Sequence, residues 1–245
     1  VTSFGAKVEA TPPHDISDRS IEGSLPKGED GDKIDALMER SRAILKDHPV
    51  NIKRREAGKN EATSIWLWGQ GKAPKMESYE ERFGRSGSII SAVDLMNGIG
   101  VYAGLTVIDV PGVTGYIDTN YTGKAEYGLN SLKDKDFICI HVEAPDEAGH
   151  QGLLKEKIQA IEDFDELVVG YVLENAHKFG EFRIMVVSDH PTPVELKTHT
   201  SDPVPFAMID SGESNDNGLR YNEVDAKKSG IVLDNISKYI EEFLS

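Results

Sequence analysis

Apolar residues recur along this chain with two different periods, and the period changes from segment to segment. Residues 137–142, 183–188 and 204–209 are short, nearly continuous apolar runs, which are typical of buried strands. Between the first two runs, residues 152–179 place apolar side chains three or four positions apart, which predicts a long amphipathic helix. Strands and helices alternate after about residue 74, and this predicts an α/β fold with a mostly parallel sheet.

The remaining elements follow from the same periods and from turn signals. Five more helices are predicted at residues 32–47, 78–83, 88–103, 124–132 and 231–244, and two more strands at 64–68 and 105–110. Residues 1–32 are rich in proline, glycine and acidic side chains without a clear period, which indicates loop structure. Residues 112–123 carry three glycines and several hydroxyls, a composition that suits a shaped loop at a sheet edge.

The composition describes an acidic globular chain that is long enough to bury a core. Hydrophobic residues make up 38% of the 245 positions, and the formal net charge is −15. Such a charge disfavours binding to nucleic acid and to anionic membranes, since both require clustered lysine and arginine. An anionic substrate stays open, because bound divalent cations can reverse the local field.

No segment resembles a membrane span or an export signal. No apolar run approaches the ~20 residues that cross a bilayer. The first residues lack the pattern of a secretory signal peptide, so a cytoplasmic location is expected. The single cysteine, Cys139, lies in an apolar run and is expected to be a buried core thiol.

Acidic and imidazole side chains follow the predicted strands closely. Five of them lie at or just after strand ends or in the loop that follows: Asp146, His150, Asp189, His190 and His199. In open α/β sheets, ligands bind at the carboxyl ends of the strands. Carboxylate and imidazole together suit Mn²⁺, Zn²⁺, Fe²⁺ or Co²⁺ better than Ca²⁺.

The spacing of these five residues leaves their grouping partly open. Asp146 and His150 are four positions apart, so one helical turn or a tight loop would direct both side chains at one ion. Asp189 and His190 are adjacent at a strand end, where neighbouring side chains diverge, so they suit a bridge between two ions or a loop that serves one ion. Any one of them alone would more often be a helix cap or a surface residue, but five in this order point to a metal centre.

Three motifs in this region carry a resemblance to a known family. They are D-E-A-G-H at 146–150, S-D-H-P-T-P at 188–193 and T-H-T-S-D-P-V-P-F at 198–206. This series resembles the metal signature of the alkaline phosphatase superfamily and, more narrowly, the cofactor-independent phosphoglycerate mutases of the archaeal type and their bacterial relatives. The likeness extends upstream to motifs such as P-P-H-D-I at 12–16 and L-W-G-Q-G at 67–71.

The resemblance implies a centre with two divalent metal ions, Mn²⁺ or Zn²⁺. It assigns Asp146, His150 and His199 to one ion, and Asp189 and His190 to the other. The family completes the second site with an aspartate in a D-G-M motif and with a nucleophilic serine, and neither motif occurs in this sequence. We therefore expect the sequence to be a C-terminal portion of a longer protein, with no catalytic nucleophile of its own.

The resemblance also implies an architecture. Residues 74–245 are expected to form the larger part of an alkaline-phosphatase-like core, a mostly parallel sheet sandwiched by helices. Residues 1–73 are expected to be part of a second, inserted α/β domain that covers a small phosphorylated substrate. Low-ranking candidates for contacts to that substrate are His14, Arg54, Arg55 and Lys124.

Three functions follow from these expectations. The first is a phosphoglycerate mutase that interconverts 2-phosphoglycerate and 3-phosphoglycerate through a phosphoserine. The second is another metal-dependent phosphoryl transfer, such as a homoserine-kinase-like activity, because Trp68 and Asn97 stand where archaeal relatives tend to carry arginine and lysine. The third is an inactive fragment that acts only as a binding or structural module.

Overall fold

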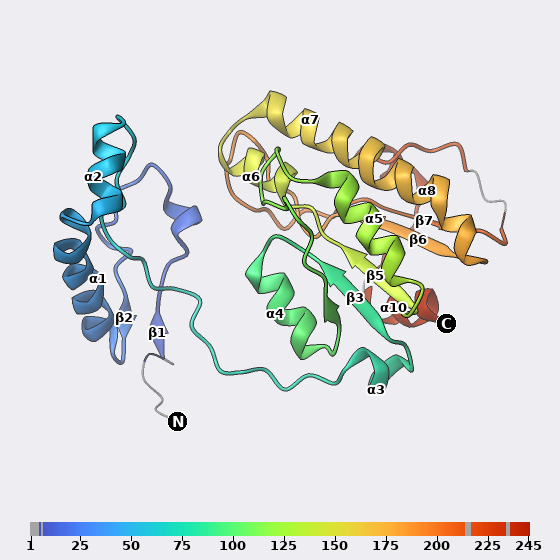
Figure 1. Cartoon of the computed structure of the whole chain (residues 1–245), viewed down its shortest axis with the longest axis horizontal. Coiled ribbons are helices and arrows are strands. Elements are labelled where there is room, and N and C mark those ends of the chain that lie inside the picture. Colours follow the sequence, from blue (N-terminus) through green and yellow to red (C-terminus); the bar gives the residue numbers. More distant parts are fainter. Residues whose placement is uncertain (1–4, 6, 214–216, 234–235) are drawn as a thin grey trace. The chain divides into compact units, whose positions relative to one another are not determined.

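A computed structural model describes residues 5, 7–213, 217–233 and 236–245 of the chain, apart from the side chains of residues 237 and 238. The chain divides into two compact units, Val1–Pro74 and Lys75–Ser245. Figure 1 shows the elements of each unit. Residues 1–4, on which the prediction about a secretory signal peptide partly rests, lie outside the described residues. No helix of the described residues is long and apolar enough to cross a bilayer.

The first unit is built on two helices. They are α1 (Gly31–Lys46) and α2 (Pro49–Glu56), preceded by a short antiparallel pair, β1 (Val8–Glu9) and β2 (Lys27–Gly28), and by one helical turn, η1 (Pro13–Ile16). The helix predicted at 32–47 is confirmed by α1. In the part of residues 1–32 that is described, β1, η1 and β2 are the only short interruptions of the predicted loop.

The strand predicted at 64–68 is wrong. Residues 59–78 contain no helix or strand. The Ile65 amide donates to Ser41 Oγ of α1 at 3.0 Å, and the Trp66 indole donates to the Thr11 carbonyl at 2.9 Å. The segment is therefore anchored by single side-chain hydrogen bonds, and it has no neighbouring strand with which to form a ladder.

The second unit contains a parallel sheet of three strands in the order β4-β3-β5. The strands are β3 (Gly87–Ile90), β4 (Thr106–Val107) and β5 (Phe137–Ile140). The helix predicted at 88–103 is thus wrong in its first part, because residues 87–90 form β3 and α4 (Asp94–Tyr102) begins later. Every residue of β3 is buried, so its continuous apolar run belongs to a central parallel strand rather than to one face of a helix.

Helices cover this sheet and continue to a second, smaller one. They are α3 (Tyr79–Phe83), α5 (Tyr121–Ser131), α6 (Ala144–His150), α7 (Leu154–Phe164), α8 (Tyr171–Ala176), α9 (Glu223–Ser229) and α10 (Ile236–Leu244). A π-helical segment (Asp165–Gly170) joins α7 to α8, and a short 3₁₀ turn (His177–Phe179) follows α8, so the long helix predicted at 152–179 is confirmed with interruptions. The last predicted helix, 231–244, begins only at Ile236, and residues 234 and 235 lie outside the description.

The second sheet pairs β6 (Arg183–Val187) with β7 (Phe206–Asp210) in antiparallel register. Both strands were predicted, but their antiparallel pairing was not. The α/β class and the parallel sheet between helices are confirmed.

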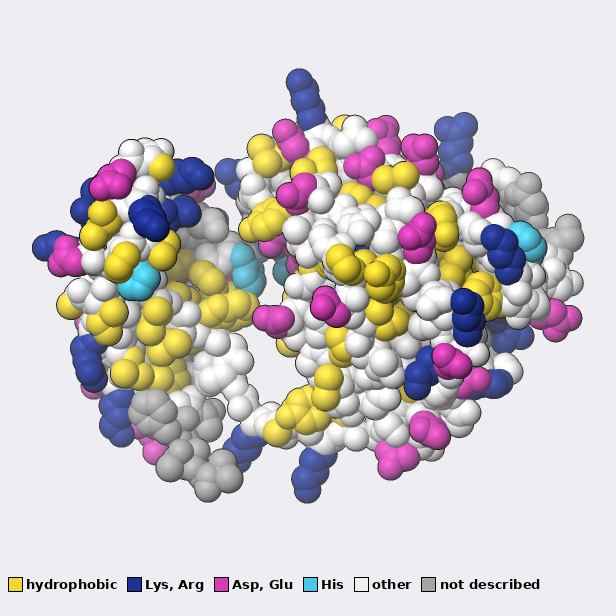
Figure 2. Space-filling model, in the orientation of Figure 1, with side chains coloured by type: hydrophobic (Ala, Val, Ile, Leu, Met, Phe, Trp, Pro, Cys, Tyr) yellow, Lys and Arg dark blue, Asp and Glu magenta, His cyan; other side chains and the backbone are white. Residues whose placement is uncertain are grey.

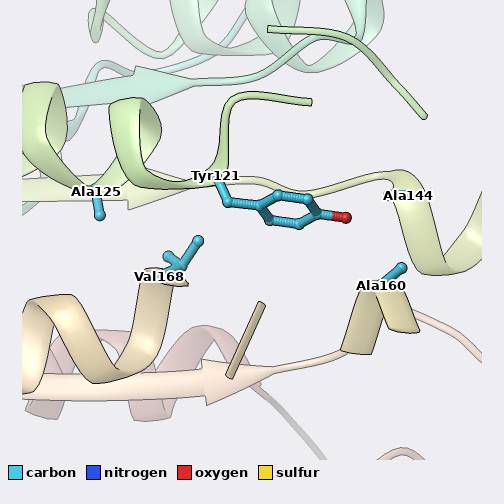
Figure 3. Packing of buried hydrophobic residues seen from close by; sticks show 5 residues of the cluster. All are labelled: Tyr121, Ala125, Ala144, Ala160 and Val168. Carbon is cyan, nitrogen blue, oxygen red and sulfur yellow. The ribbon is translucent and has the colours of Figure 1, made fainter. Parts of the chain in front are cut away.

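Small side chains bring the helices close together in the core. Figure 3 shows Tyr121 and Ala125 of α5 facing Val168 and Ala160 of the long helical stretch, with Ala144 of α6 beside them. Alanine permits close approach of two helix backbones because its side chain fills little volume. This packing fixes α6, the helix that carries the first two candidate ligands, against α7.

Part of the apolar surface stays exposed. Cys139, expected to be a buried thiol, is exposed. It pairs with Ile89, whose side chain meets α4 at Gly100, whereas its neighbours Ile138 and Ile140 face Gly128 of α5 on the other side of the sheet. Among the described helices, α5 partly covers its own face of β5, but α4 leaves Cys139 uncovered. Apolar patches are visible on the surface of both units in Figure 2.

Candidate metal centre

Two segments of the second unit supply the candidate ligands. Helix α6 follows β5 and carries Asp146 and His150 one turn apart. The buried residues of α6 are small, and the two polar side chains lie on another face of the helix. Asp189 and His190 follow the last residue of β6, and His199 lies in the loop between β6 and β7. The strand-end positions inferred from the sequence are those that the structure shows.

Asp146, His150 and His199 bring their ligand atoms close together. Asp146 Oδ2 is 3.3 Å from His150 Nε2, and Asp146 Oδ1 is 3.4 Å from His199 Nε2. The two imidazole Nε2 atoms are 2.9 Å apart. Ligand atoms bound at ~2.1 Å from one ion, at angles between ~90° and ~109°, are separated by ~3.0–3.4 Å. Each of the three separations is close to this range, with Asp146 approaching His150 through Oδ2 and His199 through Oδ1. These residues therefore fit the group that the family implies.

The tautomer of His150 also suits a ligand. Its Nδ1 is 3.0 Å from the backbone carbonyl of Lys197, to which a protonated Nδ1 donates. This bond leaves the lone pair of Nε2 directed at Asp146 and His199. A ring N–H held by a carbonyl is the usual support of a metal-binding histidine.

His190 approaches the same cluster, while Asp189 lies at its margin. His190 Nδ1 is 4.0 Å from Asp146 Oδ1, and its ring lies 3.7 Å, centroid to centroid, from the ring of His199. Asp146, His190 and His199 each offer a ligand atom within 4.8 Å of the other two. Asp189 accepts the backbone N–H of His190 and lies 3.3 Å from its ring, but the Asp189 side chain is 72% exposed. The structure therefore brings four of the five candidates together, with Asp189 contacting the fourth.

Residues that sequence reasoning missed support the cluster. The buried hydroxyl of Thr192 donates to Asp146 Oδ1 and lies 3.4 Å from His190 Nδ1. Glu143, just before α6, lies 3.3 Å from the ring of His141, whose other nitrogen is 2.9 Å from Ser91 Oγ. Thr192 lies between two prolines directly after His190, and this position is the only signal that could have drawn attention to it.

Burial shifts two groups beside the candidate ligands. Burial, reinforced by the nearby Asp146 carboxylate, raises the pKa of Glu143 to about 7. Burial also lowers the pKa of His141, and the charge of Lys124 acts in the same direction. The surroundings of α6 thus disfavour charge on both groups.

The candidate substrate contacts fall in different environments. Lys124 has no exposed surface, donates to the His141 carbonyl at 2.7 Å, and burial lowers its pKa to about 8. In the first unit, Arg54 donates to the Asn60 carbonyl and Arg55 pairs with Glu61 at 2.6 Å. His14 packs edge-on against Trp68, with ring centroids 5.3 Å apart. The structure does not gather these four residues into one unit.

The second unit combines an α/β fold with a carboxylate–imidazole cluster that could hold a metal ion. The whole-chain comparison agrees, because residues 26–240 match the metalloenzyme superfamily. The chain belongs to this superfamily, and its use of divalent metal follows from the family and the ligand cluster together.

The relatives narrow the likeness and confirm the resemblance seen in the motifs. The chain is 52% identical over 228 residues to a 2,3-bisphosphoglycerate-independent phosphoglycerate mutase of Methanosarcina acetivorans, covering 93% of this chain and 57% of that protein. It is 52% identical over 235 residues to a probable enzyme of the same name from Geobacter sulfurreducens, covering 95% of this chain and 59% of that one. The chain thus spans little more than half the length of these relatives.

A solved structure is also similar. A protein of Pyrococcus horikoshii aligns with a TM-score of 0.66 and 30% identity, over 80% of this chain and 51% of that one. The likeness supports the fold described above.

Proposed function

We propose that the protein to which this chain belongs is a metal-dependent phosphoglycerate mutase that interconverts 2-phosphoglycerate and 3-phosphoglycerate. The observation that carries the proposal is the spacing of 2.9–3.4 Å among the ligand atoms of Asp146, His150 and His199. Relatives with this name match more than nine-tenths of the chain. The substrate is a small phosphorylated acid, the two ions are Mn²⁺ or Zn²⁺, and the location is cytoplasmic.

The chain's own residues would hold and orient the ions. Asp146, His150 and His199 would bind one ion, and Asp189 and His190 would bind the other. Bound divalent cations neutralise charge on phosphoryl oxygens and lower the pKa of a hydroxyl nucleophile. The Thr192 hydroxyl fixes the rotamer of Asp146, and the Lys197 carbonyl fixes the tautomer of His150. The phosphoryl group moves to a serine supplied by a segment outside this sequence and returns to the other oxygen of the glycerate.

The proposal can be tested by phosphorus NMR. The sample is a protein that contains this chain and has the full length of its relatives, loaded with Mn²⁺ and given 3-phosphoglycerate. We expect the 2-phosphoglycerate signal to grow to its equilibrium share without added bisphosphoglycerate. The Asp146→Asn variant is the control and is expected to be inactive. A correctly metallated protein that leaves 3-phosphoglycerate unchanged would contradict the assignment.

One observation favours a second activity, the ATP-dependent phosphorylation of homoserine. Asn97, in the position where a cation was expected, is partly buried and uses its Nδ2 to donate to the Ser91 carbonyl at 3.1 Å. Its buried Oδ1 has no hydrogen-bond partner among the described residues. A site that presents an amide in place of a cation holds a carboxylate or phosphate less strongly. Formation of phosphohomoserine by the same preparation, with no mutase signal, would favour this alternative.

A further inference from the structure

Lys157 on α7 joins two backbone segments that do not belong to α7. Its half-buried ammonium donates to the Pro145 carbonyl at 3.1 Å and to the Thr192 carbonyl at 2.8 Å. Hydrogen bonds from an ammonium to carbonyl oxygens are charge-assisted and stronger than those between neutral groups. The lysine is thus a bridge, with one end in the α6 segment and the other in the loop after β6.

Both carbonyls belong to segments that carry candidate ligands. Pro145 precedes Asp146 directly, and Thr192 is two residues after His190. Thr192 is 4% exposed, and its hydroxyl in turn contacts the carboxylate of Asp146 and the ring of His190. A shift of either carbonyl would therefore move the carboxylate, the imidazole or both.

The Lys157 bridge lies where α6 and the loop after β6 approach each other closely. A Cβ atom added to Gly149 of α6 would lie 2.5 Å from the Thr192 carbonyl oxygen and 3.0 Å from Lys157 Nζ. Only glycine leaves room for this contact between α6 and the loop. Figure 1 shows α6 and α7 as neighbours, which allows a side chain of α7 to reach over α6 to the loop.

We propose that Lys157 is a positioning residue of the metal centre: its ammonium holds α6 and the loop of residues 190–199 at the separation at which Asp146, His150 and His199 bind one ion. The residue itself touches no metal. It acts through Thr192 and Pro145, in the way that outer contacts of metal ligands set their orientation. The inference rests on the metal centre of the proposed function and adds to it a residue outside the ligand motifs.

Isothermal titration of the 245-residue chain with Mn²⁺ at fixed pH tests this role in two matched variants. Lys157→Met keeps the apolar stem and removes the ammonium. Lys155→Met makes the same change two positions away, on an exposed side chain with no hydrogen bond or ion pair to any described residue. We expect Lys157→Met to weaken Mn²⁺ binding by about 10- to 100-fold, the usual effect of losing an outer contact of a ligand. Lys155→Met is expected to stay within about twofold of the parent.

Hydrogen exchange of the metal-free proteins separates positioning from general destabilisation. We expect the amides of residues 190–199 to exchange faster in Lys157→Met, while those of β3 keep the parent rate. Lys157→Arg, which can still donate to both carbonyls, is expected to recover part of the affinity.

Equal Mn²⁺ affinity for Lys157→Met and Lys155→Met would overturn the inference, and so would unchanged exchange at residues 190–199. If the parent chain bound no Mn²⁺, the metal centre itself would fail. The exchange comparison would then decide alone, because a bridge between the two segments must protect that loop with or without an ion.

Discussion

The Arg55–Glu61 ion pair of the first unit and the carboxylate–imidazole cluster of the second are assembled in opposite ways. In the first unit, Arg55 pairs with Glu61, six residues away; the guanidinium is exposed and the carboxylate is partly exposed. In the second, His150 and His199 meet across 49 residues of sequence, in partly buried surroundings beside Asp146. The first pair forms between near neighbours in sequence, whereas the cluster collects its side chains from distant segments.

This difference indicates which charged groups depend on the tertiary structure for their position. An exposed pair between near neighbours needs no particular tertiary structure and contributes little to stability. A carboxylate among several imidazoles has to be assembled by packing, and such an arrangement is retained where a bound cation stabilises it. The second unit is therefore the one in which substitutions of polar residues should change metal binding.

Replacing the central carboxylate should produce the largest effect. Asp146 contacts His150, His199, Thr192 and, at longer range, His190. Asp146→Asn removes the one negative charge that all of them share, so Mn²⁺ affinity should fall by at least about 100-fold, more than for an outer contact. Isothermal titration measures the loss.

The matched control is Asp134→Asn, which neutralises an exposed aspartate after α5. It should leave the affinity for Mn²⁺ unchanged, because its charge is screened by solvent. If Asp146→Asn bound the ion as tightly as this control, the metal centre would have to lie elsewhere.

A smaller effect should appear in the pH dependence of stability, through Lys124. Burial lowers its pKa to about 8 from 10.5. Between these two values the unfolded chain keeps the proton that the folded chain releases, so the free energy of unfolding rises with pH. The gain is present in full above about pH 10.5 and is lost as the pH falls through about 8; it amounts to at most about 3 kcal/mol.

Urea unfolding of the parent and of Lys124→Met between pH 7 and pH 10.5 measures this gain. The difference between the two proteins cancels all other titrations, and it should grow in favour of the parent as the pH rises. A constant difference would show that the pKa of Lys124 is the same in the folded and unfolded chains, against the effect of burial.

The smallest effect is expected in the first unit. Arg55→Met removes an exposed guanidinium whose partner, Glu61, is solvated in its absence. Mn²⁺ affinity and the thermal midpoint should both stay within error of the parent. A clear loss of Mn²⁺ affinity would contradict the contrast between this local ion pair and the ligand cluster of the second unit.

Some features of the fold were accessible from the sequence because they depend on short-range periodicity. The long helical stretch that begins at Leu154 and the strands β5, β6 and β7 follow from runs and stripes of apolar residues. The apolar periodicity gave wrong predictions at short apolar runs, which are compatible with either a strand or part of a helix. Residues 88–90 are a strand although a helix was predicted. Residues 64–68 are not the predicted strand, because single hydrogen bonds from Ile65 to Ser41 and from Trp66 to Thr11 hold the segment in place of a ladder.

The sequence by itself determined which residues could be ligands, since carboxylate and imidazole groups at strand ends are a matter of residue type and order. It also indicated the family, through motifs of consecutive residues. Only the tertiary structure decided how these groups meet: His190 beside His199, Thr192 on Asp146, and Lys157 between the two segments. Most of these contacts join residues far apart in sequence, and their geometry is set by the packing of helices and loops, on which local patterns carry no information.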